Sequence, residues 1–201
     1  MATVSGHPTS YDSGYSAYSV SGLNRGETDS SSTNYATIYL TRGSRAETSI
    51  YYNFSLDIPD GATINSVECT AKCYISNTQS SRIATREVRL YSGSTAKGSS
   101  ATVSNNSTSA FSVSAGTWTA EELNNAKIRV HAVRGTSSTT TNYFFRFYGA
   151  TLIVDYTEAS GTNVRVKSNG SWVEAKKVLV KQSGTWHEAT KILAKNNGTW
   201  K

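Results

Sequence analysis

The stretch "YFFRFYGATLIVDY", residues 143–156, decides the fold class of this chain. Large apolar residues recur in it at every second position, which is the period at which side chains on a β-strand return to the same face. The apolar parity that includes Phe147 ends at Gly149, and the opposite parity begins with Ala150. One extra residue at Gly149 would restore a single apolar face, because glycine tolerates the backbone of a β-bulge. The stretch therefore predicts a long strand with a bulge at Gly149.

Earlier segments show the same alternation and predict further strands. Each has apolar residues on one face and polar residues on the other, as expected where one side of an antiparallel sheet is buried. The chain is rich in Ser, Thr, Gly and Tyr, a composition that favours strands and turns. We therefore expect an antiparallel β-sandwich. The positions expected to face its core in three of the segments are Ala36, Ile38 and Leu40; Ile50, Tyr52, Phe54, Leu56 and Ile58; and Ile128, Val130 and Ala132.

Two short motifs could suggest chemistry, and each has a simpler structural interpretation. Cys69 and Cys73 lie about 13 Å apart if "VECTAKC" is a strand, which is too far for a disulfide. Both are therefore expected as reduced, buried thiols, and we expect no metal site, because the histidines are scattered. In "TWTAEELNNA" the carboxylates Glu121 and Glu122 are explained by a helix start, with Thr119 and Glu122 forming a capping box.

The net charge of +6 belongs to the C-terminal part of the chain. From residue 159 onward there are eight cations and two anions, whereas the first 158 residues hold twelve of each. No apolar run is long enough to cross a membrane, and the start lacks the basic and apolar regions of a signal peptide. We expect folding in a cytoplasm without membrane insertion, and no cofactor. The predicted parts are a sandwich at 1–157 with an irregular, Tyr- and Ser-rich start at 1–34, a linker at 158–163, and a repeat region at 164–201.

The repeat region consists of three similar units with a period of fourteen residues. Each contains Asn-Gly or Ser-Gly, which is typical of the two-residue turn of a β-hairpin. Such a turn places Lys181 opposite Trp186 on one face and Val180 opposite His187 on the other. In the first unit the equivalent pairs are lysine with tryptophan and valine with valine. The hairpins then have one apolar face and one face on which Lys contacts Trp. The predicted binding residues are Trp172, Trp186, Trp200, Lys167, Lys181, Lys195, Val166 and Val180.

The apolar face of these hairpins needs a partner, because a lone hairpin is marginally stable in water. The sandwich, a second copy of the chain or another protein could supply it, and we expect intermolecular packing. Glycan binding through the Trp faces is an alternative. Nucleic-acid binding is disfavoured, because each Lys is expected to contact its own Trp. A choline-binding cage is disfavoured as well, because each unit lacks a second aromatic residue.

Four segments resemble a domain found in virion proteins of tailed bacteriophages. The resemblance covers about residues 10–157, and "FYGATLIVDYT" is its most recognisable part. It implies a jelly-roll-like sandwich in a minor structural or tail-fibre-like protein, and it transfers no catalytic residue. The segments are "YSAYSVSGLNRGETDSSSTNYATIYLTRGSRAETSIYYNFSLDIPDGATINSVECTAKCYIS", "LYSGSTAKGSSATV", "WTAEELNNAKIRVHAVRGTS" and "RFYGATLIVDYT".

The resemblance and the repeats together predict a non-enzymatic structural protein of a virion, used in particle architecture or host-surface attachment. Its type would be a tail, fibre or capsid-decorating component. The expected partners are other virion proteins and further copies of the chain, with a trimer favoured. The alternative is a glycan-binding module for a bacterial cell-surface polysaccharide. A hydrolase is disfavoured, since no Ser–His–Asp set is visible and neither His131 nor His187 has an identifiable acidic partner.

Overall fold

The computed structural model describes residues 1–12, 20–40, 47–104, 108–136, 141–158, 165–168, 171–174, 178–189, 195–196 and 199–200. Two compact units make up the chain, Met1–Glu158 and Ala159–Lys201. Among the described residues, no helix has the length and apolar character needed to cross a membrane.

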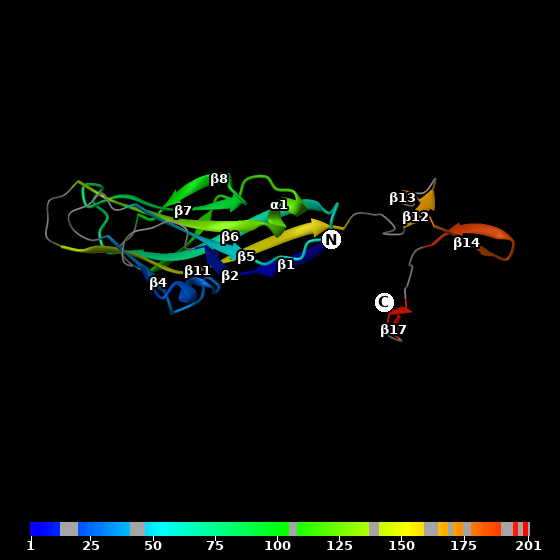
Figure 1. The fold of residues 1–201 in the computed structure, drawn as a ribbon, viewed down its shortest axis with the longest axis horizontal. Coiled ribbons are helices and arrows are strands. Elements are labelled where there is room, and N and C mark those ends of the chain that lie inside the picture. The colour runs from blue at the N-terminus through cyan, green and yellow to red at the C-terminus, as the bar shows by residue number, and fades with distance from the viewer. Residues whose placement is uncertain are drawn as a thin grey trace. The chain divides into compact units, whose positions relative to one another are not determined.

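The first unit is built from two antiparallel sheets packed face to face (Figure 1). The larger sheet has the strand order β3-β4-β11-β6-β9, and β1 also pairs with β11. The smaller sheet has the order β2-β5-β10-β7-β8. The elements are β1 (Ala2–Gly6), β2 (Pro8–Asp12), β3 (Val20–Ser21), η1 (Leu23–Gly26), β4 (Ala36–Leu40), β5 (Glu47–Phe54), β6 (Thr63–Ile75), β7 (Ile83–Ser92), β8 (Thr95–Thr102), β9 (Ser109–Val113), α1 (Ala120–Asn124), β10 (Ala126–Arg134) and β11 (Tyr143–Thr157).

The chain changes sheet repeatedly along these strands. It passes from β4 in the larger sheet to β5 in the smaller one and returns with β6. It then crosses to β7 and β8, returns with β9, crosses to β10 and ends in the larger sheet with β11. Most neighbouring strands in either sheet are therefore distant in sequence.

The inner faces of the two sheets form one hydrophobic core, and the expected all-β antiparallel sandwich is confirmed. Every core position predicted in the three strand segments is buried. Tyr52 of the smaller sheet and Phe147 of the larger sheet bring their ring centres to 4.8 Å across the core. β5 ends at Phe54, however, so Leu56 and Ile58 enter the core from the segment that follows the strand.

The bulge predicted at Gly149 is confirmed. The register of β11 with β6 shifts between Phe147 and Gly149, and Gly149 has a φ of 126°, a conformation that residues with a Cβ seldom adopt. The loop after η1 contacts the larger sheet at this point, where the Ala150 amide donates a hydrogen bond of 3.0 Å to the Thr28 carbonyl. A Cβ atom on residue 149 would lie 2.5 Å from the Asp29 carbonyl oxygen. The bulge thus restores the apolar face and makes room for this loop.

The start of the chain is more regular than the sequence indicates. An irregular start was expected from its Tyr- and Ser-rich composition, yet β1 pairs with the second half of β11 and β2 pairs with β5. The alternation in β1 is carried by Ala2, Val4 and Gly6, which are small residues. Gly6 packs so closely on Leu56 that a Cβ atom would lie 2.6 Å from it. Small residues give a weak periodic signal, which is why the strand is hard to predict.

Two short-range predictions are also confirmed. Cys69 and Cys73 are buried and unpaired, and burial raises the pKa of Cys69 to about 12. At the start of α1, the Thr119 side chain accepts from the Glu122 amide, and the Glu122 carboxylate accepts from the Thr119 amide, so the capping box is present. Glu122 also forms an ion pair with Lys97 at 2.8 Å. Its carboxylate therefore stabilises the start of the helix and binds a lysine of β8.

Paired strands in the described part of the second unit form three hairpins. Each hairpin consists of two short antiparallel strands that are consecutive in the chain and pair with each other. They are β12 (Arg165–Ser168) with β13 (Ser171–Glu174), β14 (Leu179–Gln182) with β15 (Thr185–Glu188), and β16 (Lys195–Asn196) with β17 (Thr199–Trp200).

Candidate functional site

The middle hairpin, β14–β15, is the part of the repeat region where the structure describes most of the side chains. Its turn residues, Ser183 and Gly184, have φ angles of 51° and 85°. Positive values at both central positions are those of a type I′ turn, whose twist matches that of the flanking strands. Such a turn fixes which residues of the two strands face each other.

The register of the middle hairpin is the one predicted from the sequence. Lys181 lies opposite Trp186, and Val180 lies opposite His187. The Lys181 ammonium group is 5.8 Å from the centre of the Trp186 ring, within the range of a cation–π contact. The Trp186 residue is still 62% exposed. One lysine therefore leaves most of the indole surface open.

Both faces of this hairpin carry an exposed apolar residue. Val180 is 49% exposed on the face of His187, and Leu179 is 50% exposed on the face of Lys181 and Trp186. The sequence predicts a single apolar face, because that interpretation rests on the first repeat, which has arginine at the position equivalent to Leu179. The third repeat has leucine there, as the second does. The middle hairpin is therefore more apolar than the first repeat indicates.

The backbone of the other two hairpins has the same register. Lys167 pairs with Trp172, Lys195 pairs with Trp200, and Val166 pairs with another valine across the first hairpin. The predicted pairing is therefore confirmed for all three repeats at the level of the backbone. The side chains of these six residues lie outside the described part of the structure. The surroundings of the predicted binding residues are described for the middle hairpin alone.

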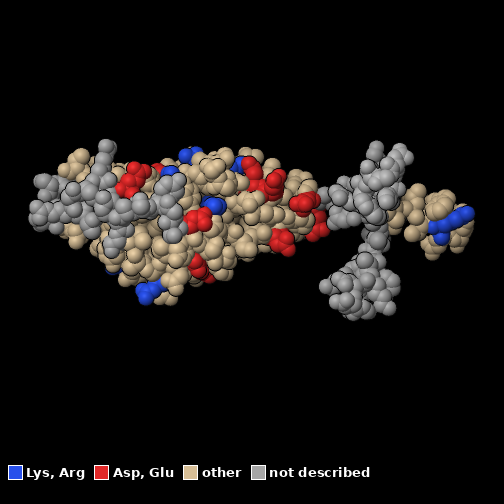
Figure 2. Space-filling model, viewed as in Figure 1, with Lys and Arg blue, Asp and Glu red and all other residues tan. Residues whose placement is uncertain are grey.

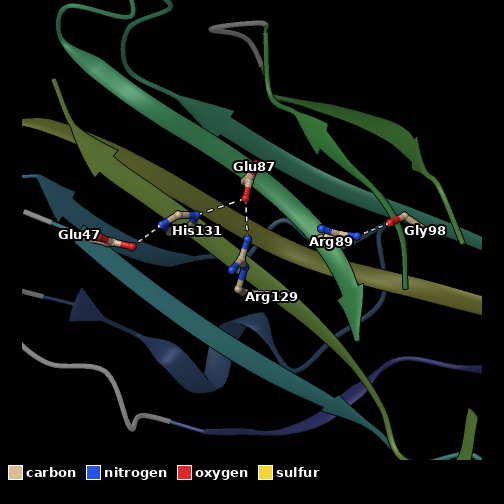
Figure 3. A network of polar contacts seen from close by, with 6 residues as sticks. All are labelled: Glu47, Glu87, Arg89, Gly98, Arg129 and His131. Carbon is tan, nitrogen blue, oxygen red and sulfur yellow. Dashed lines mark hydrogen bonds and ion pairs between the residues drawn. The ribbon is translucent and has the colours of Figure 1, made fainter. Parts of the chain in front are cut away.

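A second group of polar side chains lies on the outer face of the smaller sheet (Figure 3). His131 on β10 lies between two carboxylates: its Nδ1 is 3.2 Å from Glu87 on β7, and its Nε2 is 3.1 Å from Glu47 on β5. Arg129, on the same face of β10, donates to the same Glu87 oxygen at 2.6 Å. The network ties together three neighbouring strands that are distant in sequence.

Glu87 is the centre of this network and is held as a carboxylate. Burial raises its pKa, but hydrogen bonds from His131 and Ser100 and the charge of Arg129 outweigh that effect, so the pKa of Glu87 lies below its ordinary value. Arg89 lies directly opposite Arg129, and like charges in that position are destabilising. The carboxylate of Glu87 offsets this repulsion as well.

The interpretation that His131 has no identifiable acidic partner is wrong. Glu87 and Glu47 are 44 and 84 residues away along the chain, and the strand order of the smaller sheet brings them to the histidine. Sequence reasoning could have found part of the signal, because these residues all fall on the polar parity of their strands. The hydrogen bonds and ion pairs of this network join side chains of β5, β7 and β10, so we interpret it as a cross-link between the three strands.

Replacing Glu87 with glutamine is expected to lower the free energy of unfolding at neutral pH by about 1–3 kcal/mol, because hydrogen bonds to a charged group are weakened. The lowered pKa gives the sign of the pH dependence. The stabilisation is fully present above the ordinary value of 4.5 and is lost as the pH falls through the lower pKa of the folded state. Urea denaturation between about pH 7 and pH 3 should show the difference between wild type and variant shrinking.

A matched control for this variant is Glu68→Gln. Glu68 is an exposed carboxylate on β6 of the other sheet, so its replacement should change the free energy of unfolding by less than about 0.5 kcal/mol. A stability difference for Glu87→Gln that stays constant with pH would contradict the role given to this carboxylate.

No similar protein assigns a function to the middle hairpin or to the network around Glu87. Among the described residues, no group of three or more His, Cys, Asp or Glu side chains could hold a metal ion. Comparison of the chain with protein-family models, with curated proteins and with solved structures gave no match. The functional assignment therefore rests on the geometry of the molecule and on its sequence.

Proposed function

We propose that this protein is a non-enzymatic structural component of a tailed-bacteriophage virion, of tail, fibre or capsid-decorating type, used in particle architecture or host-surface attachment. The observation that carries the proposal is the middle hairpin, which exposes Leu179, Val180 and Trp186. An isolated hairpin is marginal in water, and neighbouring exposed apolar residues mark a surface for a partner. The proposed partners are other virion proteins and further copies of the chain.

The strand order of the first unit supports a jelly-roll assignment, which we include in the proposal. Strands β4-β11-β6-β9 form one sheet and β5-β10-β7-β8 the other, with the chain alternating between the sheets as it does in a jelly roll. This architecture occurs in viral capsid proteins and in lectins. Because one fold hosts many functions, the assignment supports the setting of the protein more than any particular role.

The oligomeric part of the proposal is that the hairpins of three copies pack together through their shared apolar face. Val180→Gln and Leu179→Gln form a matched pair, since the two residues are 49% and 50% exposed and adjacent on one strand, so they lie on opposite faces. We expect light scattering to show a trimer for the full chain and for Leu179→Gln, and a monomer for Val180→Gln. A monomeric wild-type chain would remove this part of the proposal.

Mass spectrometry of purified phage particles tests the setting. We expect peptides of this chain at a constant ratio to the major capsid protein through successive purification steps. Loss of the chain during purification, or its absence from intact particles, would count decisively against a virion role.

The alternative is a glycan-binding module that recognises a bacterial cell-surface polysaccharide through the repeats. The exposed indole of Trp186 favours it, because an open aromatic face can pack on a sugar ring. Trp186→Ala separates the two functions: adsorption to polysaccharide should fall if a glycan binds there, while incorporation into particles persists. Unchanged adsorption would remove the alternative.

A further inference from the structure

Three aromatic rings surround one guanidinium group on the outer face of the larger sheet. Arg146 on β11 lies opposite Tyr74 on β6 and two residues after Phe144. The Arg146 Cζ atom is 4.3 Å from the centre of the Tyr35 ring, 4.6 Å from that of Phe144 and 5.5 Å from that of Tyr74. The Tyr74 and Phe144 rings are themselves stacked, with centres 5.8 Å apart. All four residues are partly buried, so the rings hold the guanidinium group in place.

Arg146 has hydrogen-bond donors that the described part of the chain does not use. Within those residues its side chain has no acceptor, and its buried Nε is without a partner. Arg86 and Arg89 of the same unit differ in that the side chain of each donates to a backbone carbonyl, although the Nε of Arg89 is without a partner as well. A guanidinium group carries five N–H donors in a planar fork. The fork of Arg146 is therefore positioned by rings and finds no acceptor among the residues that the structure describes.

A second cation borders the cluster. Lys72 lies 5.5 Å from the centre of the Tyr148 ring, and that ring packs on Tyr35 at 5.0 Å. Lys72 is held by a hydrogen bond of 2.8 Å to the Ser32 carbonyl. No ion pair of Lys72 or Arg146 occurs among the described residues. The Arg146 patch consists of Tyr35, Lys72, Tyr74, Phe144, Arg146 and Tyr148.

The patch suits a ligand in which an anion is attached to a ring with an apolar face. A guanidinium group binds a carboxylate through two parallel hydrogen bonds, and binding sites combine aromatic walls with a few placed polar groups. We propose that the Arg146 patch binds an acidic saccharide, with the carboxylate of a uronic-acid or sialic-acid residue on Arg146 and its sugar ring against the aromatic side chains. The site lies on the first unit and does not depend on the hairpins.

Single-stranded nucleic acid also combines anions with stacking rings, and the charge of the first unit argues against it. The first 158 residues hold twelve cations and twelve anions. On the face of this unit that is visible in Figure 2, acidic and basic side chains are interspersed. Affinity for a nucleic-acid backbone grows with the number of phosphates neutralised. The patch has one arginine and one lysine, which matches a ligand with a single carboxylate better than a chain of phosphates.

Titration calorimetry of the full chain tests the proposal with three carboxylated probes: an oligogalacturonate, a hyaluronan oligosaccharide and a sialylated oligosaccharide. The methyl ester of the same oligosaccharide is the matched ligand, because it keeps the sugar ring and removes the charge. We expect at least one acid to bind and its ester to bind at least about tenfold more weakly. Failure of all three acids to bind, or equal binding of acid and ester, would overturn the proposal.

Variants assign the binding to the patch. Arg146→Lys keeps the charge but loses the planar fork, and we expect it to weaken binding at least about tenfold; Tyr35→Ala should also weaken it. Arg82→Lys is the matched control, since Arg82 also lies against an aromatic ring, that of Tyr143, at 5.8 Å. Circular dichroism melts verify that each variant is folded.

Two results with these variants would overturn the proposal. One is saccharide binding that Arg146→Lys and Tyr35→Ala leave unchanged in folded protein. The other is binding of oligothymidylate in place of the saccharides, lost in Arg146→Lys, which would identify the patch as a nucleic-acid site.

Discussion

Replacing Gly149 with alanine is expected to lower the free energy of unfolding of the first unit by about 3 kcal/mol or more, because two costs combine. A φ of 126° is strained for any residue with a Cβ, at about 1–3 kcal/mol. The new methyl group would also lie 2.5 Å from the Asp29 carbonyl oxygen. The loop could move away only by losing the hydrogen bond between Ala150 and Thr28. Urea denaturation followed by circular dichroism measures the change.

Gly93→Ala is the control for Gly149→Ala. Gly93 also has a positive φ, of 57°, but nothing lies within 4 Å of a Cβ atom built there. Its replacement should cost about 1 kcal/mol, the ordinary penalty of a left-handed conformation. Similar losses at the two positions would show that the close approach of the loop to β11 has no energetic weight.

The second large effect is expected for Phe147→Ala, which should cost about 3–5 kcal/mol. Phe147 is 1% exposed, and its ring packs on Tyr52 of the opposite sheet at 4.8 Å. Removing it leaves a cavity between the two sheets, which the strands on either side cannot close without disturbing their hydrogen bonds. The same denaturation experiment measures the loss.

Two further variants locate the origin of this loss. Phe144→Ala removes the same side chain from the outer face of the same strand, where Phe144 is only partly buried, and should cost less than half as much as Phe147→Ala. Tyr52→Phe keeps the ring and removes the hydrogen bond of 3.2 Å to the Leu23 carbonyl, at about 1 kcal/mol. Equal losses for Phe144 and Phe147 would contradict the assignment of inner and outer faces.

Features set by neighbouring residues could be predicted from the sequence. The bulge at Gly149 follows from a change of parity within one strand, and the pairing of Lys181 with Trp186 follows from a two-residue turn. In both cases the signal lies within one short segment of the chain, as a change of parity in a single strand or as a turn between two adjacent strands. The capping box of α1 belongs to the same class, because Thr119 and Glu122 are three residues apart.

Features that depend on strand order could not be predicted. Glu87 reaches His131 because β7 and β10 are neighbours, and Tyr74 reaches Arg146 because β6 and β11 are neighbours. Alternation of polar and apolar residues shows which face a side chain occupies, but not which strand lies beside it. The network around Glu87 and the Arg146 patch are therefore both formed by the order of the strands in the sheets. The residue pattern of a single strand does not show that order.

The pairing of β1 with β11 has a mechanical consequence. β1 begins and β11 ends at the same end of the larger sheet, since Ala2 pairs with Tyr156. A force that pulls these two ends apart acts across the pair and opens it one hydrogen bond at a time, as a zipper opens. The same strands pulled along their length would have to break those bonds together. How the first unit is anchored in an assembly would therefore decide how much tension it withstands.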